Sequence, residues 1–295
     1  MVLDGLYCWL WPRTGWNRID PARVAADCRD LGIEGVIPHD GFTAAKWLRP
    51  STSNPKKYGD RVKPFLAEGL KVAVGIGRSH GLDDEPKEAC ADAIGEALAL
   101  PWRLPVMLDW EGKYDLAGGK EKAAWIADAV LHTHPDAAER IVDCPWWAPL
   151  YRLRSGGTKG WTHPSAPYVE FGKLCRGDRY VQAYGSADGE SLRMLAWSRD
   201  PSQYPAIAAK AGVPAWTIRG AFTTYHRSWL DVASTTLAEP KSILWSYLEM
   251  DDACRRGLRV ARALRAFGFT GPDALTRYAA DQRIELGAIP AHLGL

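Results

Sequence analysis

At its centre the chain reads Leu104-Pro105-Val106-Met107-Leu108-Asp109-Trp110-Glu111-Gly112, an apolar run that ends in two carboxylates one residue apart. A short apolar run stopped by polar residues and glycine predicts a buried strand whose carboxyl end opens into solvent. Because side chains alternate along a strand, Asp109 and Glu111 are expected on the same side. Cleavage of an acetal needs such a pair, since one acid protonates the leaving oxygen and the other stabilises a cationic carbon. Asp-x-Glu is nevertheless common, and a solvated loop start explains most of its occurrences.

Strand-like and helix-like segments alternate on both sides of this run, up to about position 266, which predicts a parallel sheet with crossover helices. Strands are expected at 6–10, 35–38, 71–76, 105–111, 140–144, 180–183, 213–218 and 242–247. The clearest helices are expected between Asp20 and Gly32, and at 60–68, 85–98, 120–132, 202–211 and 252–267. The helices after the fifth and seventh strands are poorly marked, and 155–167 reads as a long loop. Eight such units favour an α/β fold of the (β/α)₈ TIM-barrel type over a doubly wound sheet.

The predicted domain organisation is one barrel over residues 1–267 followed by a short C-terminal tail over 268–295. Gly268 and the Gly271-Pro272 pair separate the tail, which contains one short amphipathic helix around 273–280. A docking tail for a virion or assembly partner and a wall-binding fragment are both open interpretations. A simple surface appendage is the favoured one.

Composition narrows the class of protein. The 37 basic and 35 acidic residues are scattered without a run of one sign, so nucleic-acid binding is not indicated, although a net charge of +2 allows weak attraction to an anionic wall polymer. The six cysteines lack any Cys-x-x-Cys spacing, which predicts buried reduced thiols. No stretch reaches the roughly 18 apolar residues of a membrane span, and an acid stands where a secretory signal would be apolar. We therefore expect cytoplasmic synthesis without a signal peptide, with release at lysis or carriage in a virion.

In barrels of this type the chemistry collects at the carboxyl ends of the strands. The candidate residues there are acids, aromatics and one arginine: Arg78, Asp109, Glu111, Asp143, Trp146, Trp147, Tyr184 and Glu249. The seven histidines do not show the convergent spacing of a metal site, and no dinucleotide, phosphate-loop or serine-elbow motif occurs. The sequence thus predicts no metal and no cofactor, and a rim suited to a polyhydroxylated ligand.

Residues 105–111 resemble the fourth strand of the glycoside hydrolase family 25 lysozymes, the barrel muramidases of phages and bacteria. Residues 141–147, Ile-Val-Asp-Cys-Pro-Trp-Trp, are similar to that family's fifth strand, and 180–185, Tyr-Val-Gln-Ala-Tyr-Gly, are similar to its sixth. The segments 31–37 and 69–75 resemble its second and third helix-to-strand entries. The resemblance extends over about residues 1–266.

The resemblance implies that Glu111 donates the proton and that Asp109 stabilises the cationic transition state or orients the substrate's acetamido group. The other candidates contact substrate, with Trp146 and Trp147 as a sugar platform. One departure is plain: the family has an acid at the end of strand one, where this chain reads Tyr7-Cys8-Trp9-Leu10-Trp11. Two functions follow, a glycosidase acting on peptidoglycan or a related N-acetylated polysaccharide, and a non-catalytic carbohydrate-binding or structural barrel of a phage particle or cell-surface assembly.

Overall fold

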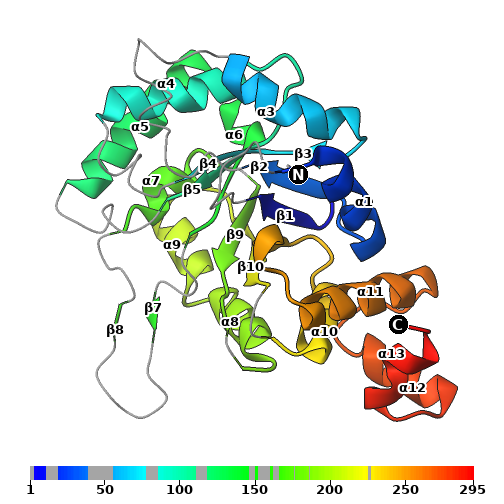
Figure 1. The fold of residues 1–295 in the computed structure, drawn as a ribbon. Helices are drawn as coiled ribbons and strands as arrows, with labels where there is room; N and C mark the ends of the chain where they lie inside the picture. Colours follow the sequence, from blue (N-terminus) through cyan, green and yellow to red (C-terminus); the bar gives the residue numbers. More distant parts are fainter. Residues whose placement is uncertain are drawn as a thin grey trace.

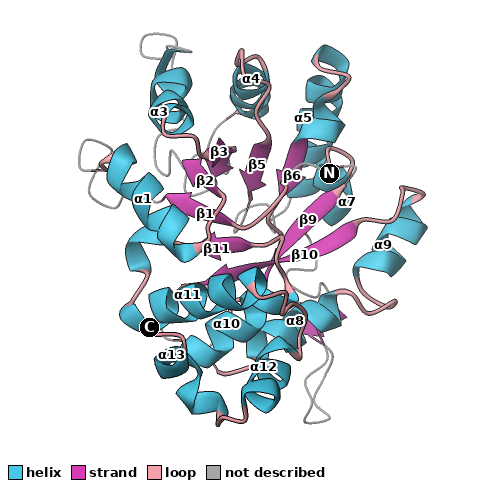
Figure 2. Cartoon of the chain, turned by 90° about the vertical axis from the view of Figure 1, so that its right-hand side faces the viewer, coloured by secondary structure: helices cyan, strands magenta, loops and turns pink. Residues whose placement is uncertain are grey.

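The computed structural model describes residues 3–10, 19–38, 56–77, 86–110, 118–145, 150–151, 160–161, 166–175, 177–185, 187–224 and 227–295. Parallel strands form its centre and helices surround them, as Figure 2 shows. The strands of the main sheet are β1 (Tyr7–Leu10), β2 (Gly35–Pro38), β3 (Lys71–Val72), β4 (Val74–Gly77), β5 (Val106–Asp109), β6 (Ile141–Asp143), β9 (Asp178–Gln182), β10 (Thr217–Thr223) and β11 (Ile243–Trp245). Their order is β3-β2-β1-β11-β10-β9-β6-β5-β4, with every described pairing parallel.

The ring closes through the third predicted strand, which changes partner at Ala73. Before this residue β3 pairs with β2, and after it β4 pairs with β5. The amide of Ala73 donates to the Val36 carbonyl at 3.0 Å, and the next amide, of Val74, donates to the Pro105 carbonyl at 2.8 Å. The two ends of the sheet are therefore one continuous segment, and the fold is the expected α/β barrel of the TIM type.

The helices on the outside follow the strands in chain order. They are α1 (Pro21–Leu31), α3 (Lys56–Ala67), α4 (Lys87–Leu98), α5 (Gly119–Thr133), α6 (Ala137–Arg140), α7 (Tyr168–Gly172), α8 (Glu190–Ser198), α9 (Tyr204–Ala211), α10 (Trp229–Ala238) and α11 (Asp252–Ala266). Helix α1 begins and ends as its sequence predicts, since the Asp20 side chain accepts from the Ala22 amide and Gly32 closes the helix at φ 70°. Among the described residues, no helix combines the length and the apolar character that crossing a membrane requires.

Two predicted segments differ in the structure. The seventh strand begins at Thr217 rather than at 213 and extends to Thr223, because its register is set by pairing with β9, where Thr217 lies opposite Asp178. Its second half contains Gly220 and Thr223, so a search for continuous apolar runs does not recognise it as a strand. Residues 155–167 are expected to form a long loop, but β8 (Gly160–Trp161) lies within this stretch. It forms a short antiparallel pair with β7 (Leu150–Tyr151), which lies just before the stretch.

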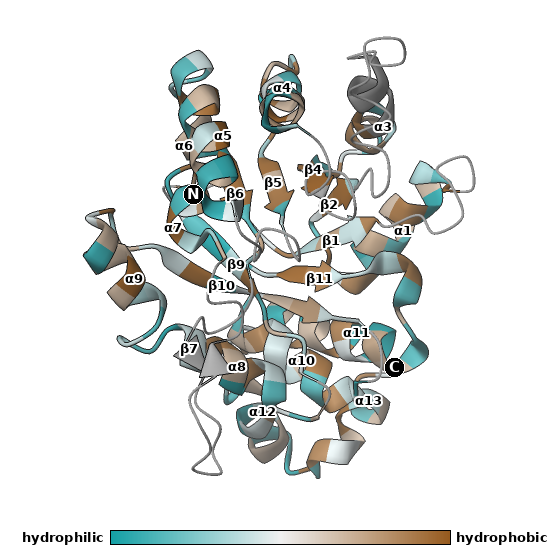
Figure 3. Ribbon diagram, turned by 90° about the vertical axis from the view of Figure 1, so that its left-hand side faces the viewer, coloured by the Kyte–Doolittle hydropathy of each residue, from teal (hydrophilic) through white to brown (hydrophobic). Residues whose placement is uncertain are grey.

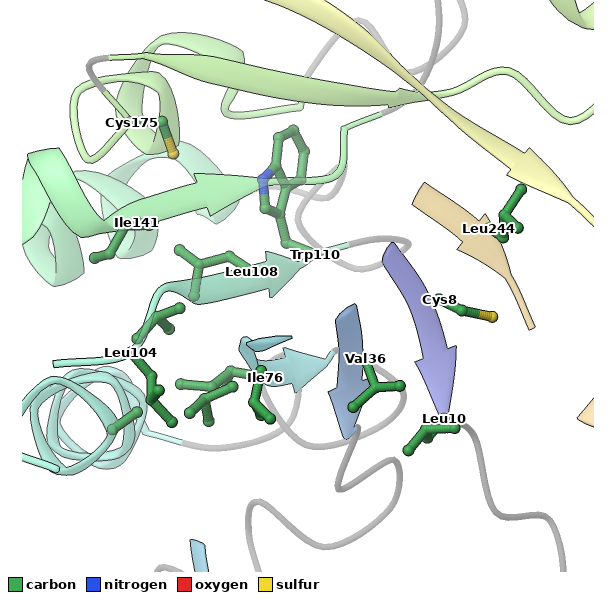
Figure 4. Close-up of a cluster of buried hydrophobic side chains, with 14 of the residues drawn as sticks. Cys8, Leu10, Val36, Ile76, Leu104, Leu108, Trp110, Ile141, Cys175 and Leu244 are labelled. Carbon is green, nitrogen blue, oxygen red and sulfur yellow. The ribbon is translucent and has the colours of Figure 1, made fainter. Parts of the chain in front are cut away.

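Strand alternation divides the core into two layers. The outer layer, between strands and helices, holds side chains such as Cys8, Leu108 and Trp110 (Figure 4). The inner layer fills the barrel with Tyr7, Trp9, Ile37, Ala73, Met107, Val142, Cys144, Tyr180, Ala221 and Ile243. Strands with both faces buried read as continuous apolar runs, and β4, β5 and β11 are correspondingly brown in Figure 3, whereas the helices carry both kinds of residue.

The C-terminal segment is folded against the barrel's last helices, beside α10 and α11 in Figure 1. It contains α12 (Ala274–Gln282), η5 (Leu286–Ala288) and α13 (Ile289–His292). One apolar cluster joins it to the two barrel helices, with Ala233, Leu237, Val260, Ala261 and Leu264 on their side and Ala274, Leu275, Tyr278, Ala279 and Ile289 on its own. The packing gives the segment a buried face without assigning it a partner.

Candidate functional site at the strand ends

Asp109 is the last residue of β5 and belongs to the inner face of the barrel. Met107, two residues earlier, lies in the inner layer, whereas Leu108 and Trp110 lie in the outer one. The Asp109 side chain is 5% exposed. Because all strands of the ring run in the same direction, this carboxylate lies at the mouth where chemistry is expected in a barrel.

Gln182 approaches Asp109 from two strands away. It ends β9, and its amide nitrogen donates to Asp109 Oδ1 at 3.4 Å and to the Cys144 carbonyl at 3.1 Å. Asp109, Gln182 and the chain after β6 therefore meet inside the barrel. A buried amide donor keeps a carboxylate oriented without neutralising its charge.

Aromatic side chains border the same interior. Tyr184 follows β9 and Trp245 ends β11, and both are partly buried against the inner layer. Trp245 contacts Trp9 edge to face, with ring centroids 5.4 Å apart. The Trp245–Ser246 peptide bond is cis, and the Thr224 hydroxyl donates to the carbonyls of these two residues at 2.9 and 2.7 Å. The predicted candidate Tyr184 is thus at the rim, together with a tryptophan that the sequence did not single out.

Trp9 occupies the inner position on strand one. Its indole is fully buried and lies over Gly75, where an added Cβ would come within 2.4 Å of the ring. The neighbours Cys8 and Leu10 belong to the outer layer. Within β1, then, the interior receives Tyr7 and Trp9, neither of which is an acid.

Asp143 is placed on the other face of the sheet. It ends β6, is fully buried, and forms an ion pair with Arg179 in which Nη2 lies 2.5 Å from Oδ2. Burial alone would lower the pKa of Arg179, but the charge and hydrogen bonds of Asp143 raise it above its ordinary value. Because this side chain points toward the helices rather than toward Asp109, we leave it out of the proposed site.

Glu249 lies in the 3₁₀ turn η4 (Tyr247–Glu249) that follows β11, where its side chain is half-buried. Tyr247, two residues earlier, packs toward α1, where its hydroxyl donates to Asp27 at 2.6 Å. Four of the candidates, Arg78, Glu111, Trp146 and Trp147, lie outside the described residues. Their roles stay predictions.

The strand-end rule placed Gln182 among the residues expected at the rim without choosing it as a site residue, and it did not name Trp245. Trp245 is the last residue of β11, so the same rule names it once the strand boundary is known. Among the residues that the structure covers, no group of three or more His, Cys, Asp or Glu could hold a metal ion. A hollow of about 660 Å³ lies between α4 and α5, and its lining includes Glu88, Asp92 and Trp125 but no strand residue. That hollow is separate from the strand ends.

No family model and no curated protein matches the sequence. Solved structures share its fold. The catalytic domain of a hyperthermophilic chitinase from Pyrococcus furiosus is 10% identical, with a TM-score of 0.54 over 92% of this chain and 98% of that one. Thermotoga maritima Cel5A, solved with mannotriose, is 13% identical, with a TM-score of 0.52 over 87% and 96%.

The same fold also appears in a protein of unrelated chemistry. The octameric ribulose-1,5-bisphosphate carboxylase/oxygenase from Pyrococcus horikoshii is 12% identical, with a TM-score of 0.50 over 99% of this chain and 62% of that one. At these identities the likeness establishes the barrel that the chain shares with glycoside hydrolases. Function has to be argued from the site, because one fold carries many chemistries.

Proposed function

We propose that the chain is a glycoside hydrolase that cleaves peptidoglycan or a related N-acetylated polysaccharide by carboxylate acid/base catalysis. The observation that carries the proposal is the position of Asp109, an oriented carboxylate on the inner face at the end of a barrel strand. Partly buried Tyr184 and Trp245 border the same interior and offer aromatic faces of the kind on which sugar rings stack. The chitinase catalytic domain that shares the barrel supports the same chemistry.

In the proposed mechanism Glu111 gives its proton to the glycosidic oxygen as the bond from that oxygen to the anomeric carbon breaks. Asp109, which Gln182 holds in place, stabilises the positive charge that develops on the sugar or orients its acetamido group. Water supplies the hydroxyl group to the anomeric carbon, and its remaining proton restores Glu111. A general acid of this kind must hold its proton near neutral pH, which a neighbouring carboxylate favours.

The substrate would extend from this pair across the rim. Tyr184 is proposed to contact the sugar, and Trp146 and Trp147 are proposed as a stacking platform. Arg78 and Glu249 are proposed as polar contacts. The tail over 268–295 packs against α10 and α11 and is proposed as a surface appendage of the barrel, with docking to a virion or assembly partner as the alternative.

One observation favours a second function, a barrel that binds a glycan without cutting it. Trp9 fills the inner position of β1 over Gly75, and β1 contains no acid, whereas the family 25 pattern has one at the end of strand one. This buried indole supplies packing but no proton transfer. A binding barrel of a phage particle or cell surface would retain the aromatic rim and lack turnover.

Purified cell walls and colloidal chitin separate the two functions. A glycosidase releases reducing ends from one of these polymers and shortens it, whereas a binding barrel co-sediments with the polymer and leaves its length unchanged. Substitution Tyr184→Ala should weaken retention in both cases. A protein that neither cuts nor sediments with either polymer would refute both assignments.

A further inference from the structure

A buried ionic network lies directly behind the strand that carries Asp109. The Asp143 carboxylate at the end of β6 accepts from Arg179 twice, from Nε at 2.9 Å and from Nη2 at 2.5 Å. It also accepts from the indole nitrogen of Trp110 at 3.1 Å. These three side chains are fully buried; Asp143 lies on β6, Arg179 lies on β9, and Trp110 directly follows β5.

The network is locked in place by the helices outside it. Arg179 donates from Nη1 to the Tyr168 carbonyl of α7 at 2.6 Å, and its guanidinium lies 4.4 Å from the Trp216 ring centroid and 5.3 Å from that of Tyr204. An added Cβ at Gly172 would come within 2.8 Å of Arg179 Nη1 and 2.4 Å of the Trp216 ring. These contacts place the guanidinium between α7, α9 and the Trp216 ring.

Trp110 connects this network to the site, because it is the residue after Asp109. Its indole packs against Tyr168 and Phe171, with ring centroids 5.7 and 5.2 Å away, and Figure 4 shows it reaching across the end of β6. Fixing this side chain on the outer face fixes the backbone at the end of β5. The direction in which the Asp109 side chain leaves the inner face follows from that backbone.

We propose that Asp143 and Arg179 are positioning residues that act through Trp110 to orient the Asp109 carboxylate, an inference that rests on the proposed function of Asp109. In this proposal Asp143 acts on Asp109 from the outer face of the sheet and does not contact the sugar. A buried pair of this kind is often no more stabilising than apolar side chains of the same volume, so stability alone does not account for it. A role in geometry accounts for the pair, because the hydrogen bonds to the two oxygens of Asp143 hold the ends of β5 and β6 in a fixed position relative to β9.

Two tryptophan substitutions test the inference. Trp110→Phe keeps an aromatic ring against Tyr168 and Phe171 but removes the donor to Asp143. Trp125→Phe is the control, because Trp125 lies on α5 in the hollow that is separate from the strand ends, where Lys87 Nζ lies 4.6 Å from its ring centroid. Two readouts are compared: kcat, KM and the pH–rate profile on purified peptidoglycan and colloidal chitin, and the side-chain amide NMR signals of Gln182, assigned by their loss in Gln182→Met.

Trp110→Phe is expected to lower kcat at least tenfold with KM within twofold, to alter the pH–rate profile, and to shift the Gln182 signals. Trp125→Phe should leave all of these near wild type. The inference is overturned if Trp110→Phe leaves kcat and the Gln182 signals unchanged, or if both variants change them equally. Should the wild-type protein cleave neither polymer, the proposed hydrolysis fails on its own, and the Gln182 signals of the two variants still decide whether Trp110 orients Asp109.

Discussion

Removing one member of the buried ion pair should cost much of the protein's stability. The substitution Arg179→Met keeps most of the side-chain length but leaves the Asp143 carboxylate fully buried without its cationic partner. Breaking such a pair from one side costs about 3–5 kcal/mol. The lost hydrogen bond to the Tyr168 carbonyl and the lost ring contacts bring the expected decrease in the free energy of unfolding to about 4–6 kcal/mol.

The double substitution Asp143→Leu with Arg179→Met should recover most of this loss. With both charges gone, no ion is left buried alone, and the variant is expected within about 2 kcal/mol of wild type. Urea unfolding followed by tryptophan fluorescence at pH 7 measures all four proteins of the cycle, and coincident circular dichroism curves check that one transition is being followed. The reasoning is refuted if Arg179→Met loses less than about 1 kcal/mol, or if the double variant is as unstable as the two single losses combined.

Three further predictions concern the barrel and its tail. Gly75→Ala should lower the free energy of unfolding by about 1–3 kcal/mol because its Cβ would overlap the Trp9 ring. The control Gly177→Ala, whose Cβ would meet nothing within 4 Å, should change it by less than about 0.5 kcal/mol, and equal urea midpoints for the two variants would contradict this. Burial, and after it the charge of Asp27, raises the pKa of the Cys28 thiol to about 12. Because the thiol of the unfolded chain loses its proton at a lower pH, the free energy of unfolding should fall between about pH 9 and 12, and it should fall less steeply in Cys28→Ala. An identical pH dependence in the two proteins would exclude this cause. Leu275→Ala in α12 should lower the free energy of unfolding by about 2–3 kcal/mol if the tail unfolds with the barrel, whereas a separate early transition would show that it folds as an independent unit.

Local signals predicted the architecture well. The sequence from Asp20 to Gly32 contains a capping side chain, a first-turn proline and a terminal glycine, and the helix begins and ends at these residues. The apolar run before Asp109 forms a strand with both faces buried, as its composition indicates. These features depend on neighbours in the chain, so they can be read from the chain alone.

Features set by distant partners could not be read in this way. The face on which Asp143 lies is fixed by strand register, and its partner Arg179 is 36 residues away. The seventh strand took its start from pairing with β9 rather than from its own apolar residues. Trp9 fits an exposed sugar platform or core filler equally well in the sequence, and its full burial over Gly75 shows that it fills the barrel.

Release of reducing ends from purified peptidoglycan and colloidal chitin, compared between the wild-type protein and Glu111→Gln, tests the central claim most directly. The account predicts that the wild-type protein shortens one of these polymers, and that Glu111→Gln still sediments with it while releasing reducing ends on the order of 100-fold more slowly, the usual contribution of a general acid. Unchanged turnover in Glu111→Gln would remove this residue from the mechanism. A wild-type protein that retains the polymer uncut would identify a binding barrel instead.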